Sequence, residues 1–169
     1  VEADGEPDQI AGQLQALQQV LRGPGMVEIK QAMAAEEVAR LWRARRALSG
    51  AVKALAPLKI NEDIVVPVSR LAALTAEIEA LARRHELPIV SFGHAGNGNL
   101  HVNIMVHPER AGEMARAQAC LQSLFETVLA LGGTLSGEHG IGAAKRAFVP
   151  LEIPADTLAL MRAIKREFD

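Results

Sequence analysis

Aromatic side chains are scarce in this chain of 169 residues, at 3% of the total, and tyrosine is absent. So few rings argue against a platform on which nucleic-acid bases or other planar groups could stack. Apolar residues still make up 49% of the chain, and the length suffices for one domain with a substantial core. Alanine and leucine must therefore build that core, which favours a high helix content.

Basic blocks, long apolar runs and cysteine pairs are missing too. The formal net charge is −2, and no cluster of lysine and arginine suggests a nucleic-acid partner. No apolar run reaches the roughly 18 residues of a membrane span, and residues 1–5 lack the features of a signal peptide. The single cysteine, Cys120, can form no internal disulfide, and its helical surroundings predict a buried apolar role. These absences predict a cytoplasmic protein with no membrane span and no nucleic-acid partner.

The most informative stretch is residues 91–103, SFGHAGNGNLHVN, in which three glycines fall within six residues. An apolar pair precedes it and an alternating run follows it, which predicts strand, tight loop and strand. His101 and Asn103 share a face of the second strand because alternate residues point the same way. The glycine-rich loop can fold His94 back toward them, so two imidazoles and a carboxamide are predicted to converge.

A second glycine-bounded stretch, GGTLSGEHGIG at residues 132–142, adds Glu138 beside His139. Neutral imidazoles and a carboxylate with an open position are the ligands of a catalytic zinc or a similar divalent ion. A structural interpretation fits the same spacing, because histidines near strand ends often hydrogen-bond to backbone and glycine-rich turns often only close hairpins. The first loop is not a dinucleotide fingerprint, since no helix start follows it.

Apolar periodicity predicts an α+β fold in which helices cover one side of an antiparallel sheet. The expected order of elements is β-α-β-α-β-α-β-β-α-β-α-α. The helices are predicted at about residues 7–22, 35–55, 69–85, 108–131 and 154–168, and one of the strands at residues 26–31. Lys145 and Arg146, beyond the second motif, are expected to face solvent.

The sequences GHAGNGNLHVN and GGTLSGEHGIGAAKR, about forty residues apart, closely resemble the C-terminal (cap) domain of FAD-linked 2-hydroxy-acid oxidases and dehydrogenases. That family includes the glycolate oxidase flavin subunit, D-lactate dehydrogenase (cytochrome) and D-2-hydroxyglutarate dehydrogenase, within the vanillyl-alcohol-oxidase superfamily. The similarity extends from about Glu28 to Asp169. It implies an oxidoreductase in which a D-2-hydroxy acid gives its Cα hydride to FAD and becomes a 2-oxo acid.

The resemblance also implies a division of labour among the motif residues. His94, His101 and Glu138 match the ligands of a divalent metal, which their chemistry suggests is zinc. His139 matches the base that takes the hydroxyl proton, a task suited to an imidazole because its pKa lies near working pH. Asn103 matches a substrate-contacting amide.

Substrate binding is further implied for the helix around residues 35–55. Trp42 and Arg45 match a Trp-x-x-Arg pattern whose arginine binds the substrate carboxylate, for which a planar guanidinium is well shaped. Ser49 follows one turn later on the same face. A lysine stands near the substrate in some relatives, and Lys59 is the nearest candidate, although the aligned position holds Asn61. A solvated basic face is the alternative for the arginines of this helix.

The domain that holds most of the FAD in the family is not visible in this sequence. We therefore expect residues 1–169 to be one partial domain of a larger flavoenzyme, inactive in hydride transfer without the N-terminal FAD domain. The expected partners are that domain and a small 2-hydroxy acid; the electron acceptor and homo-oligomerisation are left open. The alternatives are a stand-alone metal-dependent hydrolase and a non-catalytic binding module.

Overall fold

The computed structural model describes residues 2–3 and 5–168, and the side chains of Pro7 and Ser49 lie outside that description. The chain divides into two compact units, Val1–Ala47 and Leu48–Asp169. Helix α2 (Ala35–Val52) contributes residues to both. Among the described residues, no helix is long and apolar enough to cross a membrane.

The N-terminal unit (Val1–Ala47) contains helix α1 (Pro7–Leu21) and the first part of α2. Proline suits the first turn of α1 because it lacks the N–H that would be left without an intrahelical partner there. The strand predicted at residues 26–31 is wrong. Val27 is 96% exposed, and no strand pairs with this segment in the described part of the chain. Alternation alone does not make a strand without a partner.

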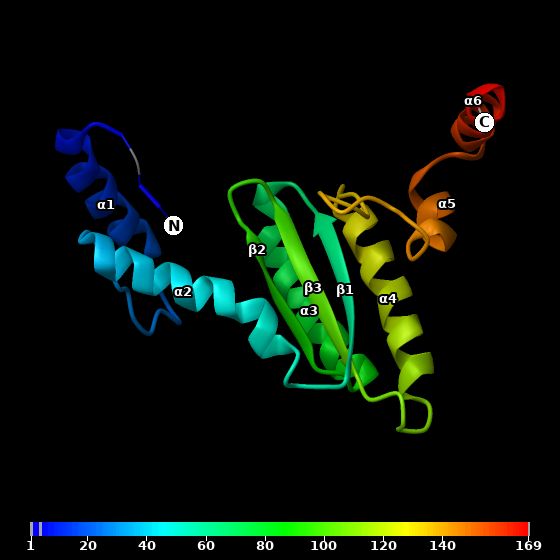
Figure 1. Ribbon diagram of the computed structural model, residues 1–169, viewed down its shortest axis with the longest axis horizontal. Coiled ribbons are helices and arrows are strands. Elements are labelled where there is room, and N and C mark those ends of the chain that lie inside the picture. The colour runs from blue at the N-terminus through cyan, green and yellow to red at the C-terminus, as the bar shows by residue number, and fades with distance from the viewer. Residues whose placement is uncertain (1, 4, 169) are drawn as a thin grey trace. The chain divides into compact units, whose positions relative to one another are not determined.

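The C-terminal unit (Leu48–Asp169) is built on an antiparallel sheet of three strands (Figure 1). Strand β3 (Asn99–Val106) lies in the middle, between β1 (Leu58–Val65) and β2 (Ile89–His94). A tight turn joins β2 to β3, as the glycine-rich loop predicts. The register pairs His101 with Asp63 on one side and with Phe92 on the other.

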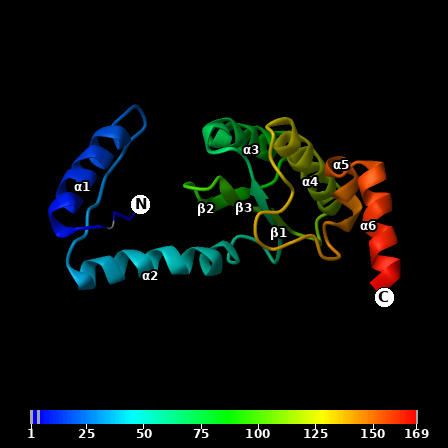
Figure 2. The ribbon, with the colours of Figure 1, turned by 90° about the horizontal axis from the view of Figure 1, so that it is seen from above.

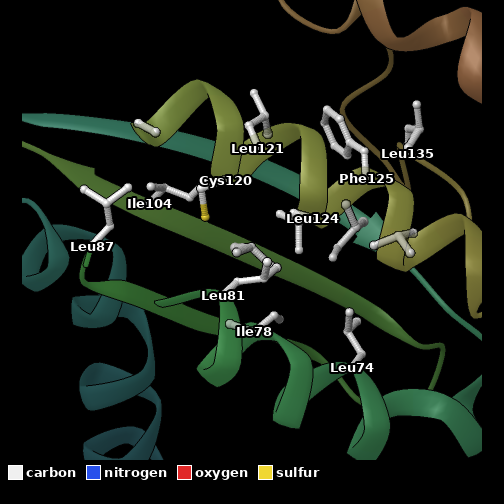
Figure 3. Close-up of a cluster of buried hydrophobic side chains, with 14 of the residues drawn as sticks. Leu74, Ile78, Leu81, Leu87, Ile104, Cys120, Leu121, Leu124, Phe125 and Leu135 are labelled. Atoms are coloured by element: carbon white, nitrogen blue, oxygen red, sulfur yellow. The ribbon is translucent and has the colours of Figure 1, made fainter. Parts of the chain in front are cut away.

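One face of the sheet is covered by helices α3 (Leu71–His85) and α4 (Glu113–Ala130), which lie on the same side of the strands (Figure 2). The even-numbered β3 residues face these helices; of them Val102, Ile104 and Val106 are fully buried. Figure 3 shows Ile104 among side chains from both helices. The core of this unit includes fully or nearly fully buried side chains from both helices: Leu74, Ile78, Leu81, Cys120, Leu124 and Phe125. The predicted α+β class is confirmed.

The opposite face of the sheet, here called the site face, carries the odd-numbered β3 residues. His101, Asn103 and Met105 lie on it in a row, because successive strand residues alternate between faces. Met105 is covered by Val52 and Ala56. The polar end of the row, around His101, carries the predicted site.

Several helix ends differ from the sequence prediction. Helix α3 begins after a 3₁₀ turn, η1 (Val68–Arg70), and α4 begins at Glu113, five residues beyond Pro108. After α4, where a full strand was expected, the described part of the chain pairs with β1 at a single bridge between Val65 and Thr134. The chain closes with the 3₁₀ turn η2 (Arg146–Phe148), α5 (Val149–Glu152) and α6 (Ala155–Phe168).

Candidate metal centre

The turn between β2 and β3 brings His94 close to His101. His94 is the last residue of β2 and pairs with Asn99, while His101 lies two residues further along β3. Gly98, at φ +78°, allows the turn to lie against the chain that follows β1, where a Cβ would collide with the Val66 carbonyl. The Asn97 side chain accepts a hydrogen bond from the Asn99 N–H at 3.2 Å, which fixes the turn locally.

The three predicted metal ligands meet on the site face. Oε1 of Glu138 lies 3.1 Å from Nε2 of His101 and 4.0 Å from Nε2 of His94. One ligand atom from each of the three residues lies within 4.8 Å of the others. Two ligands about 2.1 Å from a tetrahedral ion lie about 3.4 Å apart. The chemistry of the donor set suits a small divalent ion. The separation of 3.1 Å between Glu138 and His101 is close to this spacing, whereas the 4.0 Å between Glu138 and His94 is wider.

His139 joins this group from the same loop as Glu138. Its ring stacks on that of His101, with centroids 5.3 Å apart and planes at 24°. The His94 ring approaches His101 edge-on at 5.8 Å. Glu138 and His139 thus both contact His101, although they are adjacent residues that a regular strand would point in opposite directions. The absence of regular strand at 137–140 allows both to reach His101.

Electrostatics favour a neutral imidazole at His101. Burial lowers the pKa of His101, with Glu138 opposing this shift and His139 and His94 reinforcing it. The His101 side chain is 13% exposed, whereas that of Glu138 is 50% exposed. A neutral imidazole keeps the lone pair that a metal ligand needs, so the surroundings of His101 suit that role.

Asn103 lies two residues beyond His101 on the site face and is fully buried. Its Nδ2 donates hydrogen bonds to the carbonyls of Val90 and His101, at 3.0 and 3.4 Å. Its Oδ1 is buried and has no hydrogen-bond partner within the described residues. A buried acceptor left in this state costs free energy unless another group satisfies it.

The residues expected to bind the substrate carboxylate are not joined to this group by the structure. Arg45 is exposed on α2 within the N-terminal unit, and the Ser49 side chain lies outside the described residues. Asn61 is exposed on β1 directly opposite Asn103, and the partly buried Lys59 lies opposite Met105. Of the two alternatives on β1, Asn61 is therefore two residue pairs nearer to His101 along the strand.

Sequence reasoning missed two charged residues beside the candidate metal ligands, Asp63 and Lys145. Lys145 was expected in solvent but is only 5% exposed, because its Nζ is 2.6 Å from Oδ1 of the fully buried Asp63 and 3.2 Å from Oε2 of Glu62. Arg146 is exposed as expected. The signal for the buried pair was the sequence NEDIVV, in which two acidic residues interrupt a strand with apolar flanks.

Comparison with known proteins identifies the family of the chain. The family model described as "FAD linked oxidases, C-terminal domain" matches residues 1–169. The chain is 31% identical over its full length to the glycolate oxidase subunit GlcD of Bacillus subtilis, covering 36% of that protein. It is 30% identical to a probable mitochondrial D-lactate dehydrogenase of Danio rerio, with 100% of the chain and 34% of that protein covered.

A third relative is the D-2-hydroxyglutarate dehydrogenase of Xanthomonas citri, 34% identical over 79% of the chain and 29% of that protein. The chain spans about a third of the length of these curated relatives. Because the family model matches every residue of the chain, the match does not depend on the two histidine motifs alone. The chain belongs to the family of FAD-linked oxidases, as a C-terminal domain of that family.

Proposed function

We propose that this chain is the substrate-binding part of an FAD-dependent enzyme that oxidises a small D-2-hydroxy acid to the 2-oxo acid. One observation carries the proposal: His94, His101 and Glu138 converge on one point of the site face while His139 stacks on His101. The names of the relatives, which refer to glycolate, D-lactate and D-2-hydroxyglutarate, support this substrate class.

His94, His101 and Glu138 are proposed to hold a divalent ion, with zinc the best match to two imidazoles and a carboxylate. An ion there would supply Lewis acidity toward the hydroxyl oxygen of the substrate. The three residues come from a strand end, a strand interior and a loop, so two of the three ligands are fixed by the sheet itself. Glu138 alone depends on the loop for its position.

His139 is proposed as the base. Oxidation breaks the Cα–H bond, whose electron pair leaves as hydride, and the O–H bond, whose proton must be accepted so that a carbonyl results. FAD, when bound, supplies the hydride acceptor. His139 is proposed to take the proton through Nε2, since its other ring nitrogen, Nδ1, lies on the side of Asp63, 3.7 Å from Oδ1. An imidazole titrates near neutral pH and so can accept and then release this proton.

The remaining polar groups are proposed to orient the substrate. Asn103 is proposed to accept a hydrogen bond from the substrate hydroxyl through Oδ1, which has no partner within the described residues; because this atom is buried, the contact requires the groups that cover it to move. Arg45 is proposed to bind the carboxylate through its planar guanidinium, with Ser49 adding a hydroxyl contact.

The test combines metal content with turnover in the full-length protein. Wild type should contain one equivalent of divalent metal by mass spectrometry and should oxidise a D-2-hydroxy acid with an artificial electron acceptor. His94→Ala, His101→Ala and Glu138→Ala should each lose the metal and most of the turnover. His107→Ala is the matched control, because His107 lies just beyond the far end of β3 and pairs with Glu109; it should keep both.

Two results would contradict the proposal. Full activity in protein stripped of metal would remove the proposed role of the three ligands. Hydrolysis of simple esters or amides, with no oxidation of hydroxy acids in the presence of FAD, would point instead to a metal-dependent hydrolase that uses the same ligands to activate water.

A further inference from the structure

The loop that carries Glu138 and His139 is bound through its backbone to one buried carboxylate. Oδ2 of Asp63 accepts hydrogen bonds from three consecutive N–H groups: those of Gly137 at 2.9 Å, Glu138 at 2.5 Å and His139 at 2.8 Å. The Ser136 hydroxyl donates to Oδ1 at 3.3 Å. Asp63 lies on β1 opposite His101, so the loop is attached to the sheet directly beside the metal ligands.

Lys145 completes this attachment from the far end of the loop. Its Nζ donates to Oδ1 of Asp63 at 2.6 Å, to the Asp63 carbonyl at 3.1 Å and to the Leu135 carbonyl at 2.7 Å. Leu135 precedes the motif and Lys145 follows it. One buried ammonium group therefore joins both ends of the loop to β1.

The side chains of Glu138 and His139 cannot be held by packing alone, because each is 50% exposed. Their directions follow from the backbone at 137–139. The next residue, Gly140, has φ +75°, and a glycine restricts its neighbours little. The hydrogen bonds to Asp63 are therefore the interactions that fix where the two side chains begin.

We propose that Asp63 and Lys145 are positioning residues for the metal centre. They set the backbone at 137–139 so that the Glu138 carboxylate faces His94 and His101 while the His139 ring lies on His101. This inference rests on the proposed function, since it names what holds two of its groups in place. The lowered pKa of Asp63 agrees with it: burial works to raise that pKa, but the hydrogen bonds from Lys145 and the loop amides hold it well below the ordinary range.

The chemistry explains why a carboxylate is needed at position 63. Ionised aspartate offers two oxygens that only accept, so one can bind Lys145 while the other receives three amides. Asparagine has one accepting oxygen and one NH₂ group. That NH₂ group would face either Lys145 or the loop amides, and both of these are donors. The ion pair between Asp63 and Lys145 is not by itself evidence for a stabilising role, because well-packed apolar residues can often replace a buried ion pair with no loss of stability.

The experiment is zinc titration of the full-length protein by calorimetry, with amide hydrogen exchange measured on the same samples. Wild type should protect the amides of residues 137–139, and Asp63→Asn should bind zinc about 10–100-fold more weakly, as is typical when a group that orients a ligand is lost. Those three amides should exchange faster in the variant, while amides within α4 should not.

The matched control is Glu113→Gln. Glu113 is also a buried carboxylate, 3% exposed, that accepts a backbone N–H, from His107 at 2.7 Å. It lies beyond the Val106 end of β3, away from His101. This variant should keep wild-type zinc affinity and wild-type exchange at residues 137–139, even where it lowers the midpoint of unfolding.

If Asp63→Asn does not fold, the double variant Asp63→Asn with Lys145→Met decides the question. Removing both charges leaves no unpaired ion at position 63 or 145. Glu62 loses its contact with Lys145, but burial already raises its pKa, so it can take up a proton and the variant is expected to fold, yet it still lacks the Asp63 carboxylate. Wild-type zinc affinity in it would overturn the positioning role, as would unprotected amides at residues 137–139 in wild type. Failure of wild type to bind any zinc would instead remove the proposed metal centre, and this inference with it.

Discussion

His139 stacks on His101 with ring centroids 5.3 Å apart, although one residue comes from a loop and the other from the middle strand. Glu138, its neighbour, reaches the same histidine with its carboxylate, 3.1 Å from Nε2. Two adjacent residues of one loop therefore both contact His101. Their separate proposed tasks, metal ligand and base, can be separated by mutation.

Replacing the proposed base, His139, should lower turnover strongly without removing the metal. His139→Gln should lower kcat by about 10²–10⁴-fold, the usual contribution of a positioned general base, because no group remains to take the hydroxyl proton. Metal content should stay at the wild-type level, measured on the same preparation. A parallel loss of metal would show that His139 is a ligand and would reverse this assignment.

The turn before β3 should tolerate an added methyl group at Gly96 but not at Gly98. Gly98→Ala forces a Cβ against the Val66 carbonyl at φ +78°, so the turn must move and His94 with it. We expect a loss of about 1–3 kcal/mol in the free energy of unfolding and weaker zinc binding. Gly96→Ala is the control, because nothing lies within 4 Å of its added Cβ. Equal behaviour of the two variants would contradict the proposed geometry of the turn.

The core between the sheet and the two helices should dominate stability. Leu124→Ala, at a position that is 1% exposed, should lower the free energy of unfolding by about 2–5 kcal/mol through lost apolar burial and a cavity. Leu160→Ala on α6, where the leucine is 61% exposed, should change it by no more than about 0.5 kcal/mol. Urea unfolding curves measure both, and similar losses would place the core elsewhere.

Cys120 should not react in the folded protein. It is fully buried in α4, and burial raises the pKa of its thiol to about 11. Since the thiolate is the reactive form, alkylation by iodoacetamide at about pH 8 should be slow in buffer and rapid in guanidinium chloride. Rapid labelling without denaturant would show that α4 opens easily from the sheet.

Acid should destabilise the protein through Asp63. Its pKa is lowered in the folded state from an ordinary value of 3.8, so the unfolded chain takes up the proton first. The stabilisation is complete above pH 3.8 and is lost as the pH falls below it. Glu62 acts in the opposite sense, because burial raises its pKa above 4.5; its contribution is present at low pH and is lost as the pH rises.

The Asp63 contribution is measured as the change in urea midpoint between about pH 5 and about pH 3. The double variant at positions 63 and 145 should lose less stability over this interval than wild type. Glu113→Gln, which leaves Asp63 and Lys145 unchanged, should lose more than the double variant. Parallel curves for wild type and the double variant would show that Asp63 is not the acid-sensitive group.

The sequence was sufficient to predict those features that arise from local pattern. Alternation in residues 99–106 placed His101 and Asn103 on one face, and the glycines between residues 93 and 98 predicted the turn that returns His94. The alternation at residues 26–31 misled, because a strand also needs a partner and none lies beside it in the described structure. The pattern within one segment does not reveal which distant segment it will pair with.

The support beneath the site could not be predicted in the same way. Lys145 follows a glycine-rich loop and looks like an ordinary surface lysine, and its burial depends on contacts with Asp63, 82 positions earlier in the chain. The approach of Glu138 to His101 likewise depends on how the loop folds back along β1. A charged pair of this kind becomes visible only when the sheet and the loop are placed together in space.

Anaerobic reduction of the flavin tests the central claim most directly. Full-length protein with FAD and metal is mixed with a D-2-hydroxy acid, and the loss of oxidised-flavin absorbance is followed. Wild type is compared with the single alanine variants of His94, His101 and Glu138. We predict rapid reduction by the D enantiomer in wild type, little by the L enantiomer, and a large decrease in rate in each single alanine variant. Undiminished reduction in the three variants would contradict the proposal that these residues form the reactive centre.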